Sequence, residues 1–209
     1  METLLSHPLI EDNLKRLRDK NTGVKGCREA IDILTCFLLA EATRDLELEA
    51  TEVETPICAA DCKQLKDPAP YVFQVLRAAQ SMIPAAIRML PHAILGAIGL
   101  YRDEQTLKPV SYFHKPASIT RACDIFVLDP LLATGGTSSA AISQIKASAD
   151  NPLNIRMLSI IAAPEGLAKL KADHPDVRIY VCAVDDRLNE VGYIVPGVGD
   201  VGDRYCGTL

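Results

Sequence analysis

The residues most suited to chemistry lie between Asp129 and Thr137, where the chain reads Asp-Pro-Leu-Leu-Ala-Thr-Gly-Gly-Thr. An apolar run at 125–128 precedes this segment, and a helix-like sequence at 138–146 follows it. A loop of this kind directs backbone N–H groups and hydroxyls toward one point, where the helix dipole adds partial positive charge. It is therefore suited to bind a phosphate. Because Asp129 could accept hydrogen bonds from sugar hydroxyls, the segment predicts a site for a ribose phosphate.

The loop lacks the motifs of two common nucleotide sites. It has neither the Gly-Lys-Ser/Thr of a Walker A loop nor the Gly-x-Gly-x-x-Gly of a dinucleotide fingerprint. From these residues alone, an ordinary strand-to-helix turn capped by Thr137 or Ser138 is an equal alternative. The phosphate site therefore depends on which other residues reach the same place.

Two arginines, Arg77 and Arg102, each follow a buried apolar run. Arginine suits multidentate pairing with phosphate oxygens, although either residue alone could equally be a surface arginine paired with an acid such as Asp103. If both runs are parallel strands, these arginines and Asp129 lie at the carboxyl edge of one sheet, where ligands bind in open α/β sheets. This shared position favours the phosphate site.

Apolar runs and helical patterns alternate along the chain. Near-continuous apolar runs predict buried strands, and a 3.6-residue periodicity predicts helices. The expected strands are 51–56, 71–76, 93–101, 125–129, 155–162 and 177–184, with a hairpin at 106–115. The expected helices are a short charged one near the start and those at 27–44, 84–90, 138–149 and 164–172. This alternation predicts a single α/β domain with a mostly parallel sheet flanked by helices.

Composition limits the classes of function. The chain has 209 residues, 48% apolar content and a net charge of −5, which fit one soluble domain and argue against a nucleic-acid-binding surface. The most apolar run, 93–100, is too short to span a bilayer, so no membrane association is expected. Seven cysteines at scattered positions predict reduced thiols in a cytoplasmic protein and no metal site built from protein ligands alone.

Four regions of the sequence resemble one family. The segment VLDPLLATGGT is similar to the phosphoribosyl-pyrophosphate (PRPP) loop of phosphoribosyltransferases, in the version of the uracil phosphoribosyltransferases. HPLIEDNLKRLRDKNT and LAEATRDLELEATEVETPI resemble that family's N-terminal region, IGLYRDEQTLKPVSYFHKP its segment with a phosphate-binding arginine and a β-arm, and GYIVPGVGDVGDRYCGT its uracil loop. These stretches run from about residue 7 to residue 208, so the chain is identified as a member of this family.

The resemblance implies a pentosyltransferase of the type I phosphoribosyltransferase fold that transfers the phosphoribosyl group from PRPP to uracil, giving UMP and pyrophosphate in pyrimidine salvage. It implies magnesium as the cofactor, held through PRPP and not by direct protein ligands. The implied catalytic residues are Asp200 and Arg102, and the implied uracil contacts are Ile194, Gly199, Asp200 and Val201. The implied PRPP contacts are Arg77, Arg102, Asp129, Pro130, Leu131, Leu132, Ala133, Thr134, Gly135, Gly136, Thr137 and Asp200.

The resemblance also implies an organisation of the chain. It assigns an N-terminal helical extension to about 1–45, a β-arm to about 104–116 and a small base-binding hood to about 185–209, in a homodimer or homotetramer with GTP as an effector. The hood contains a literal Gly-x-Gly-x-x-Gly at 197–202, but no helix-forming segment is expected after it, so a dinucleotide site is not predicted. A glycine-rich surface tail is the alternative.

The turn after Arg77 departs from the family pattern. Ala79 and Ser81 stand where the family usually has glycines, in a turn that presents backbone N–H groups to pyrophosphate. The replacements predict a reshaped turn and lower activity. They keep two alternatives open: a divergent paralogue that binds PRPP or a nucleotide as a regulatory protein, and an enzyme that uses another base.

Overall fold

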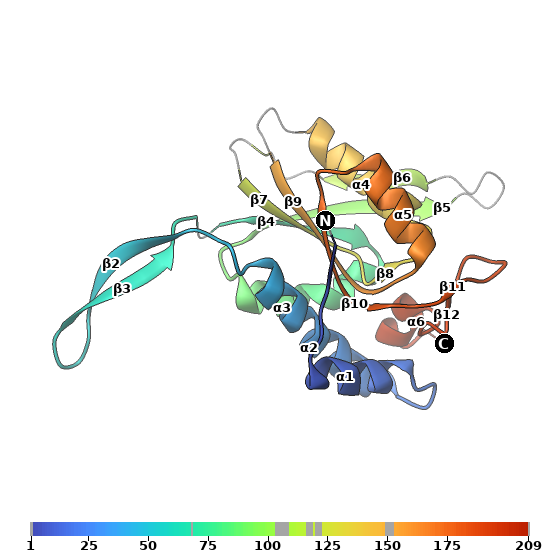
Figure 1. The fold of residues 1–209 in the computed structure, drawn as a ribbon, viewed down its shortest axis with the longest axis horizontal. Coiled ribbons are helices and arrows are strands. Elements are labelled where there is room, and N and C mark those ends of the chain that lie inside the picture. The colour runs from blue at the N-terminus through green and yellow to red at the C-terminus, as the bar shows by residue number, and fades with distance from the viewer. Residues whose placement is uncertain are drawn as a thin grey trace.

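The computed structural model describes residues 2–67, 69–102, 109–115, 119, 123–148 and 153–208, with the backbone alone at 101–102, 109–115 and 153. Its centre is a sheet with the strand order β1-β10-β9-β7-β4-β5-β6, and β8 pairs with β9 beside that path (Figure 1). β6 runs antiparallel to β5, and the other pairs are parallel. The strands are β1 (Glu2–Leu4), β4 (Tyr71–Leu76), β5 (Ile94–Arg102), β6 (Pro109–Lys115), β7 (Cys123–Leu128), β8 (Leu131–Leu132), β9 (Leu153–Ala162) and β10 (Arg178–Val184).

Helices cover both faces of this sheet (Figure 1). One face packs against α1 (Pro8–Arg18), α2 (Val24–Ala42), the short 3-10 helix η1 (Ala78–Met82), α3 (Ile83–Met89) and α6 (Val201–Cys206). The other face packs against α4 (Gly136–Ala147) and α5 (Pro164–Asp173). The predicted α/β fold with a mostly parallel sheet flanked by helices is confirmed.

The apolar strands are continuous because both of their faces are buried. In β7, Phe126 and Leu128 point into the core beneath α1 and α2, whereas Ile125 and Val127 point into the core beneath α4 and α5. All four are fully buried. Burial of a large apolar side chain contributes about 1.5–3 kcal/mol, so this strand contributes to both of the cores that join the helical layers to the sheet.

Proline sets the start of three helices. Pro8, Pro84 and Pro164 lie in the first turns of α1, α3 and α5, where the missing N–H of proline leaves no hydrogen bond unmade. At α1 the ring of His7 adds a cap, because its Nδ1 accepts a hydrogen bond from the Leu9 N–H at 3.1 Å. No helix within the described part of the chain is long and apolar enough to cross a bilayer.

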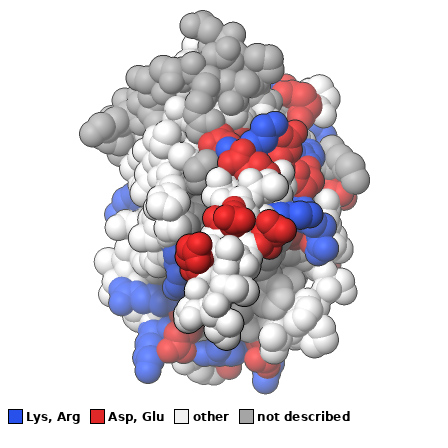
Figure 2. Space-filling model, turned by 90° about the vertical axis from the view of Figure 1, so that its left-hand side faces the viewer, with Lys and Arg blue, Asp and Glu red and all other residues white. Residues whose placement is uncertain are grey.

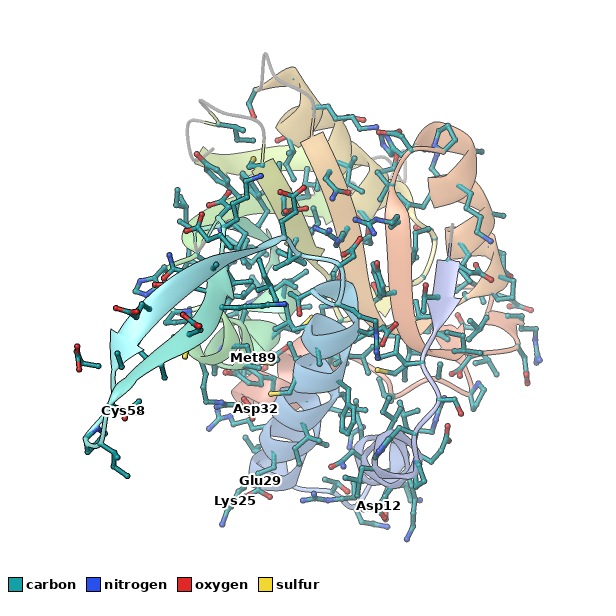
Figure 3. The ribbon with its side chains drawn as sticks, turned by 60° about the vertical axis from the view of Figure 1, so that its left-hand side comes forward. Asp12, Lys25, Glu29, Asp32, Cys58 and Met89 are labelled. Carbon is teal, nitrogen blue, oxygen red and sulfur yellow. The ribbon has the colours of Figure 1, made fainter. Side chains whose placement is uncertain are left out.

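A separate hairpin, β2 (Leu48–Glu54) paired with β3 (Ala59–Leu65), projects from the body of the molecule (Figure 1). Most of its side chains are exposed, and Cys58 lies near its tip (Figure 3). Acidic side chains gather near the middle of the side of the molecule on which the hairpin lies (Figure 2). The β-arm expected at about 104–116 lies partly outside the described residues. Its described part, Pro109–Lys115, is β6, which pairs antiparallel with β5 at the edge of the main sheet.

Candidate active site

The candidate site lies where the chain changes direction across the sheet. β4 and β7 are neighbours, but the chain leaves β4 toward β5 and leaves β7 toward β9 on the other side. The loops after the two strands therefore diverge and leave a hollow at their carboxyl ends. This hollow has a volume of about 210 Å³, and Arg77, Asp129 and the loop after β7 line it. The predicted convergence of Arg77 and Asp129 at one sheet edge is confirmed.

Residues 129–137, the segment that the sequence predicts to bind a phosphate and here called the phosphate loop, run from the end of β7 through β8 into the first turn of α4. Leu131, Ala133, Thr134, Gly135 and Thr137 line the hollow, whereas Pro130, Leu132 and Gly136 belong to the loop but do not line it. Gly135 caps α4 in a left-handed conformation with φ +76°, and its carbonyl accepts the N–H of Ser139 at 2.9 Å. The N–H groups of the first turn of α4, which have no partner inside the helix, thus face this end of the sheet, and that of Gly136 donates to the Thr134 hydroxyl at 3.5 Å.

Neighbouring elements hold the phosphate loop closely. The Ala163 N–H donates to the Leu132 carbonyl at 2.9 Å, which ties the loop to the end of β9. Gly166, in the first turn of α5, packs directly on the loop: a Cβ at this position would lie 2.4 Å from the carbonyl oxygen of Ala133 and 2.6 Å from that of Leu132. The close approach of α5 therefore requires glycine at position 166.

Asp129 is the buried acid of the hollow, with 8% of the residue exposed. Its Oδ2 accepts a hydrogen bond from the Ser138 hydroxyl at 2.8 Å, and the Leu131 backbone N–H also donates to the carboxylate. Burial raises the pKa of Asp129 to about 7, and the two hydrogen bonds act in the opposite direction by favouring the charged form. The carboxylate is thus oriented, poorly solvated and able to accept further hydrogen bonds from a ligand.

The two arginines are described to different extents. Arg77 follows β4 through a cis peptide bond with Leu76, is exposed, and makes no ion pair with any described residue. Arg102 ends β5, and Gly99, three residues earlier, lies opposite Leu76 in the parallel register. The backbone of Arg102 is therefore at the same sheet edge as predicted, while its side chain and Asp103 lie outside the described residues.

The turn that carries the two glycine replacements is the 3-10 helix η1. Ala79 is fully buried in the core beneath α1 and α2, and Ser81 is 2% exposed. The Ser81 hydroxyl donates to the Ala78 carbonyl at 2.7 Å. Both replacement side chains therefore point into the protein, and Ala78 is the η1 residue that lines the hollow.

A second hollow of about 170 Å³ adjoins the first and shares Ala78, Leu131 and Ala133 with it. Its remaining lining comes from residues 192–194 and 198–202. All four residues expected to contact a base line it: Ile194, Gly199, Asp200 and Val201. The structure thus brings the predicted phosphate loop and the predicted base-binding residues together in one continuous cleft.

The C-terminal hood that forms this second hollow is built from a small hairpin and a helix. β11 (Arg187–Leu188) pairs with β12 (Ile194–Val195), and residues 194–200, here called the base loop, lead into α6. The prediction that no helix follows the Gly-x-Gly-x-x-Gly motif at 197–202 was wrong, since α6 begins at Val201 with Asp200 as its cap. α6 is six residues long and packs on α2 and η1. It does not connect two parallel strands, so this segment is not a dinucleotide-binding βαβ unit.

The carboxylates of the cleft suit a metal ion that enters together with a phosphate-bearing substrate. Within the described part of the chain, no group of three His, Cys, Asp or Glu side chains is close enough to hold a metal ion. Asp129 and Asp200 line adjoining hollows and offer isolated carboxylate oxygens. Magnesium prefers oxygen ligands and is commonly bound through few carboxylates together with substrate phosphates, which is compatible with this site.

Sequence reasoning missed three contributors to the site. Ser138 was considered only as a helix cap, although its position one residue after the phosphate loop signalled that it could reach Asp129. Gly166 lay inside a correctly expected helix, where a glycine that lowers helix propensity is a signal of close packing. The contacts of the N-terminal helix α1 with the base loop had no sequence signal, because the partners are more than 160 residues apart.

Comparisons with known proteins agree with the geometry. The family model described as "Uracil phosphoribosyltransferase" matches residues 4–208. The chain is 46% identical to a "Uracil phosphoribosyltransferase" of Clostridium botulinum (99% of this chain, 98% of the relative) and 46% identical to one of Geobacillus kaustophilus (98% and 97%). The solved AQ2163 protein from Aquifex aeolicus superposes with a TM-score of 0.90 at 36% identity, covering 98% of this chain and 97% of that one. An adenine phosphoribosyltransferase from Leishmania donovani, at a TM-score of 0.60 and 18% identity over 91% and 86% of the chains, shares the fold. The chain therefore belongs to the uracil phosphoribosyltransferase family, as the sequence motifs predict.

Proposed function

We propose that this protein transfers the phosphoribosyl group of PRPP to uracil, giving UMP and pyrophosphate. The observation that carries the proposal is the continuous cleft: a phosphate loop with a buried carboxylate adjoins a hollow lined by the base loop. Each half suits one part of the product nucleotide. Family membership supports the same reaction.

The first hollow suits the donor. Backbone N–H groups at the start of α4 and the hydroxyls of Thr134 and Thr137 bind the phosphate on the ribose. Asp129 accepts hydrogen bonds from the ribose hydroxyls, and Arg77 and Arg102 bind the pyrophosphate. Magnesium would be held through PRPP and would supply neutralisation of part of the charge on this leaving group.

The second hollow suits a flat base with two carbonyl groups flanking a ring N–H. Backbone N–H and C=O groups of Ile194 and of residues 199–201 complement that pattern. Cytosine presents an amino group where uracil has a carbonyl, so it would leave buried groups unpaired at a cost of about 1–3 kcal/mol each. Asp200 faces the ribose and the metal-bound pyrophosphate.

The reaction needs positioning more than covalent help. The bond from the anomeric carbon to pyrophosphate breaks while the ring nitrogen of uracil forms a bond on the opposite face, and that nitrogen loses its proton. The developing charge on the leaving group is stabilised by the arginines. The protein thus acts mainly by holding both reactants in line and by fixed electrostatics.

A pyrophosphate-release assay with PRPP, magnesium and a panel of bases tests the proposal. We expect turnover with uracil and none above background with cytosine, hypoxanthine or adenine. PRPP binding without turnover of any base would favour the regulatory alternative. Turnover with a different base would instead correct the assigned specificity.

Arg102→Ala is expected to raise KM for PRPP about tenfold or more, because a charged hydrogen-bonding partner of the pyrophosphate is lost. KM for uracil, measured at saturating PRPP, should stay within about twofold. Arg88→Ala is the matched control, since Arg88 pairs with Asp32 on the surface and lies away from the cleft. Unchanged PRPP kinetics in Arg102→Ala would show that this arginine does not bind the donor.

Restoring glycine at positions 79 and 81 is expected to leave turnover within about twofold, contrary to the lower activity that the sequence alone predicts for Ala79 and Ser81. Both side chains point away from the cleft, so their removal should instead cost stability, at about 1 kcal/mol per site. Turnover of the double variant, with its thermal unfolding midpoint, separates the two expectations. A large gain in turnover would show that the replacements do reshape the turn.

We extend the proposal to the organisation of the protein. The segments at about 1–45 and 185–209 act as a helical extension and a base-binding hood of one domain, in a cytoplasmic homodimer or homotetramer that GTP activates. Light scattering after gel filtration measures the oligomeric state, and turnover with and without GTP tests the effector.

A further inference from the structure

An ion pair between Arg18 and Asp185, outside the cleft, hydrogen-bonds to the base loop on the side that faces α1. Arg18, the last residue of α1, binds both carboxylate oxygens of Asp185, at 2.5 and 2.8 Å. The same guanidinium donates to the Gly197 carbonyl at 3.0 Å, and the Gly197 N–H donates to Asp185 at 2.8 Å. Only 4% of the Asp185 side chain is exposed. Both hydrogen-bonding groups of Gly197 are therefore held by one ion pair, in which Asp185 is buried and Arg18 partly buried.

A second arginine, Arg204, hydrogen-bonds to Val198, the next residue of the base loop. Arg204, on α6, is 8% exposed and donates to the Val198 carbonyl at 3.0 Å. It also donates to the carbonyls of Leu17 and Asp19, at the end of α1. These carbonyls are among the groups that a helix terminus leaves without a partner inside the helix. One guanidinium thus joins α1, α6 and the base loop.

Because the carbonyls of Gly197 and Val198 are held on the α1 side, the geometry of the peptide bond directs the N–H groups that follow them toward the second hollow. The peptide bonds on either side of Val198 are trans, and in a trans peptide the C=O and the following N–H point in opposite directions. The carbonyls of Gly197 and Val198 are held on the α1 side by the two arginines. The N–H groups of Val198 and Gly199 must then point to the other side, where both residues line the second hollow.

Without these contacts the orientation would not be fixed. Gly197 and Gly199 have φ values of +60° and +73°, and a glycine backbone changes conformation at low cost. Among the described residues other than its two chain neighbours, no heavy atom lies within 4 Å of where a Cβ of Gly199 would be, so nearby packing does not constrain it. The two arginines hold the carbonyls of Gly197 and Val198, and Asp185 holds the Gly197 N–H, so these contacts oppose rotation of the peptides.

We propose that Arg18 and Arg204 are positioning residues for base recognition, which from outside the cleft aim the N–H groups of Val198 and Gly199 at a carbonyl of the bound pyrimidine. This rests on the function proposed above and deepens it. It makes the end of α1 part of the device that distinguishes a carbonyl-bearing base from one that carries an amino group at the same place.

The test uses Arg204→Met and Arg18→Met, which keep the apolar stem and remove the donors. Arg28→Met is the control for the first, because Arg28 donates to the Tyr205 carbonyl at 3.0 Å and so joins α2 to α6 without touching the base loop. Arg16→Met is the control for the second. Arg16 lies on the same helix and pairs at 3.0 Å with Glu29 on the surface of α2 (Figure 3).

Each test variant is expected to raise KM for uracil about tenfold while KM for PRPP stays within about twofold. Arg204→Lys, which keeps the charge but offers a smaller donor set, should restore part of the loss. Both controls should match the wild-type protein. A purely structural role predicts a lower unfolding midpoint with KM for uracil unchanged, or an equal rise in both KM values, and either result would overturn the proposal.

Amide hydrogen exchange in the ligand-free protein keeps this test separate from the enzymatic function. If the wild-type protein releases no pyrophosphate from PRPP and uracil, the proposed function fails, and exchange still reports on the loop. Faster exchange at Val198 and Gly199 in Arg204→Met than in Arg28→Met supports the anchoring. Equal exchange rates in the two variants overturn it.

Discussion

Asp129→Asn is expected to lower kcat/KM for PRPP about 100-fold or more. The buried carboxylate can accept hydrogen bonds from two ribose hydroxyls, and a hydrogen bond to a charged group contributes about 1.5–3 kcal/mol. Asparagine has one oxygen acceptor and presents an N–H donor in place of the other. Steady-state pyrophosphate release at varied PRPP and saturating uracil measures the change.

The same residue predicts a pH dependence. Because burial raises the pKa of Asp129 to about 7, its carboxylate gains a proton as the pH falls below that value, and the acceptor is lost. The parameter kcat/KM reports groups of the free enzyme, so kcat/KM for PRPP should fall on the acid side of about pH 7. The fall should disappear in Asp129→Asn, which has no carboxylate to titrate.

Asp12→Asn provides the control for charge. Asp12 lies on α1 and is exposed (Figure 3), and it lines neither hollow of the cleft. It removes the same formal charge and should leave both the rate and the pH profile unchanged. An acid limb that persists in Asp129→Asn would assign the titration to another group and would remove Asp129 from ribose binding.

Gly166→Ala is expected to have the second large effect, about 100-fold in kcat/KM for PRPP. The new Cβ would lie 2.4 Å from the Ala133 carbonyl oxygen and 2.6 Å from that of Leu132, so the phosphate loop and α5 must separate. A displacement of about 1 Å in a binding loop can cost about 100-fold in rate. Overpacking of this kind also costs about 1–3 kcal/mol of stability.

Ala168→Ser, at an exposed position of the same helix, is the control for a general effect on α5. Kinetics are measured below the unfolding midpoint of each variant, so that loss of folded protein does not count as loss of rate. The account predicts that Gly166→Ala loses PRPP affinity and that the control does not. A variant with normal PRPP kinetics would show that the loop tolerates displacement by α5.

The buried strands and the donor side of the site could be read from the sequence because local pattern determines them. Apolar runs marked β4, β5, β7, β9 and β10, since a strand covered on both faces is built mostly from apolar residues. Arg77 and Asp129 could be placed together because parallel strands present their carboxyl ends at one edge. Each inference required only the run and the residue that follows it.

Other features depend on contacts that no local pattern records. In the β2–β3 hairpin, β2 overlaps the strand expected at 51–56, but β3 is largely exposed on both sides and lacks the apolar alternation that identifies a strand, so it was not expected. α6 is too short to show helical periodicity. Arg18 and Arg204 hydrogen-bond to the base loop. Arg18 lies far from this loop in the sequence, and from the sequence alone both arginines look like ordinary surface charges.

A crystal structure of the protein with UMP is the decisive measurement, because UMP should fill both halves of the cleft. We expect the phosphate within hydrogen-bonding distance of the backbone N–H groups of residues 135–137, the ribose hydroxyls on Asp129, and the uracil ring against the base loop. A phosphate bound away from the start of α4, or a ring outside the second hollow, would contradict it.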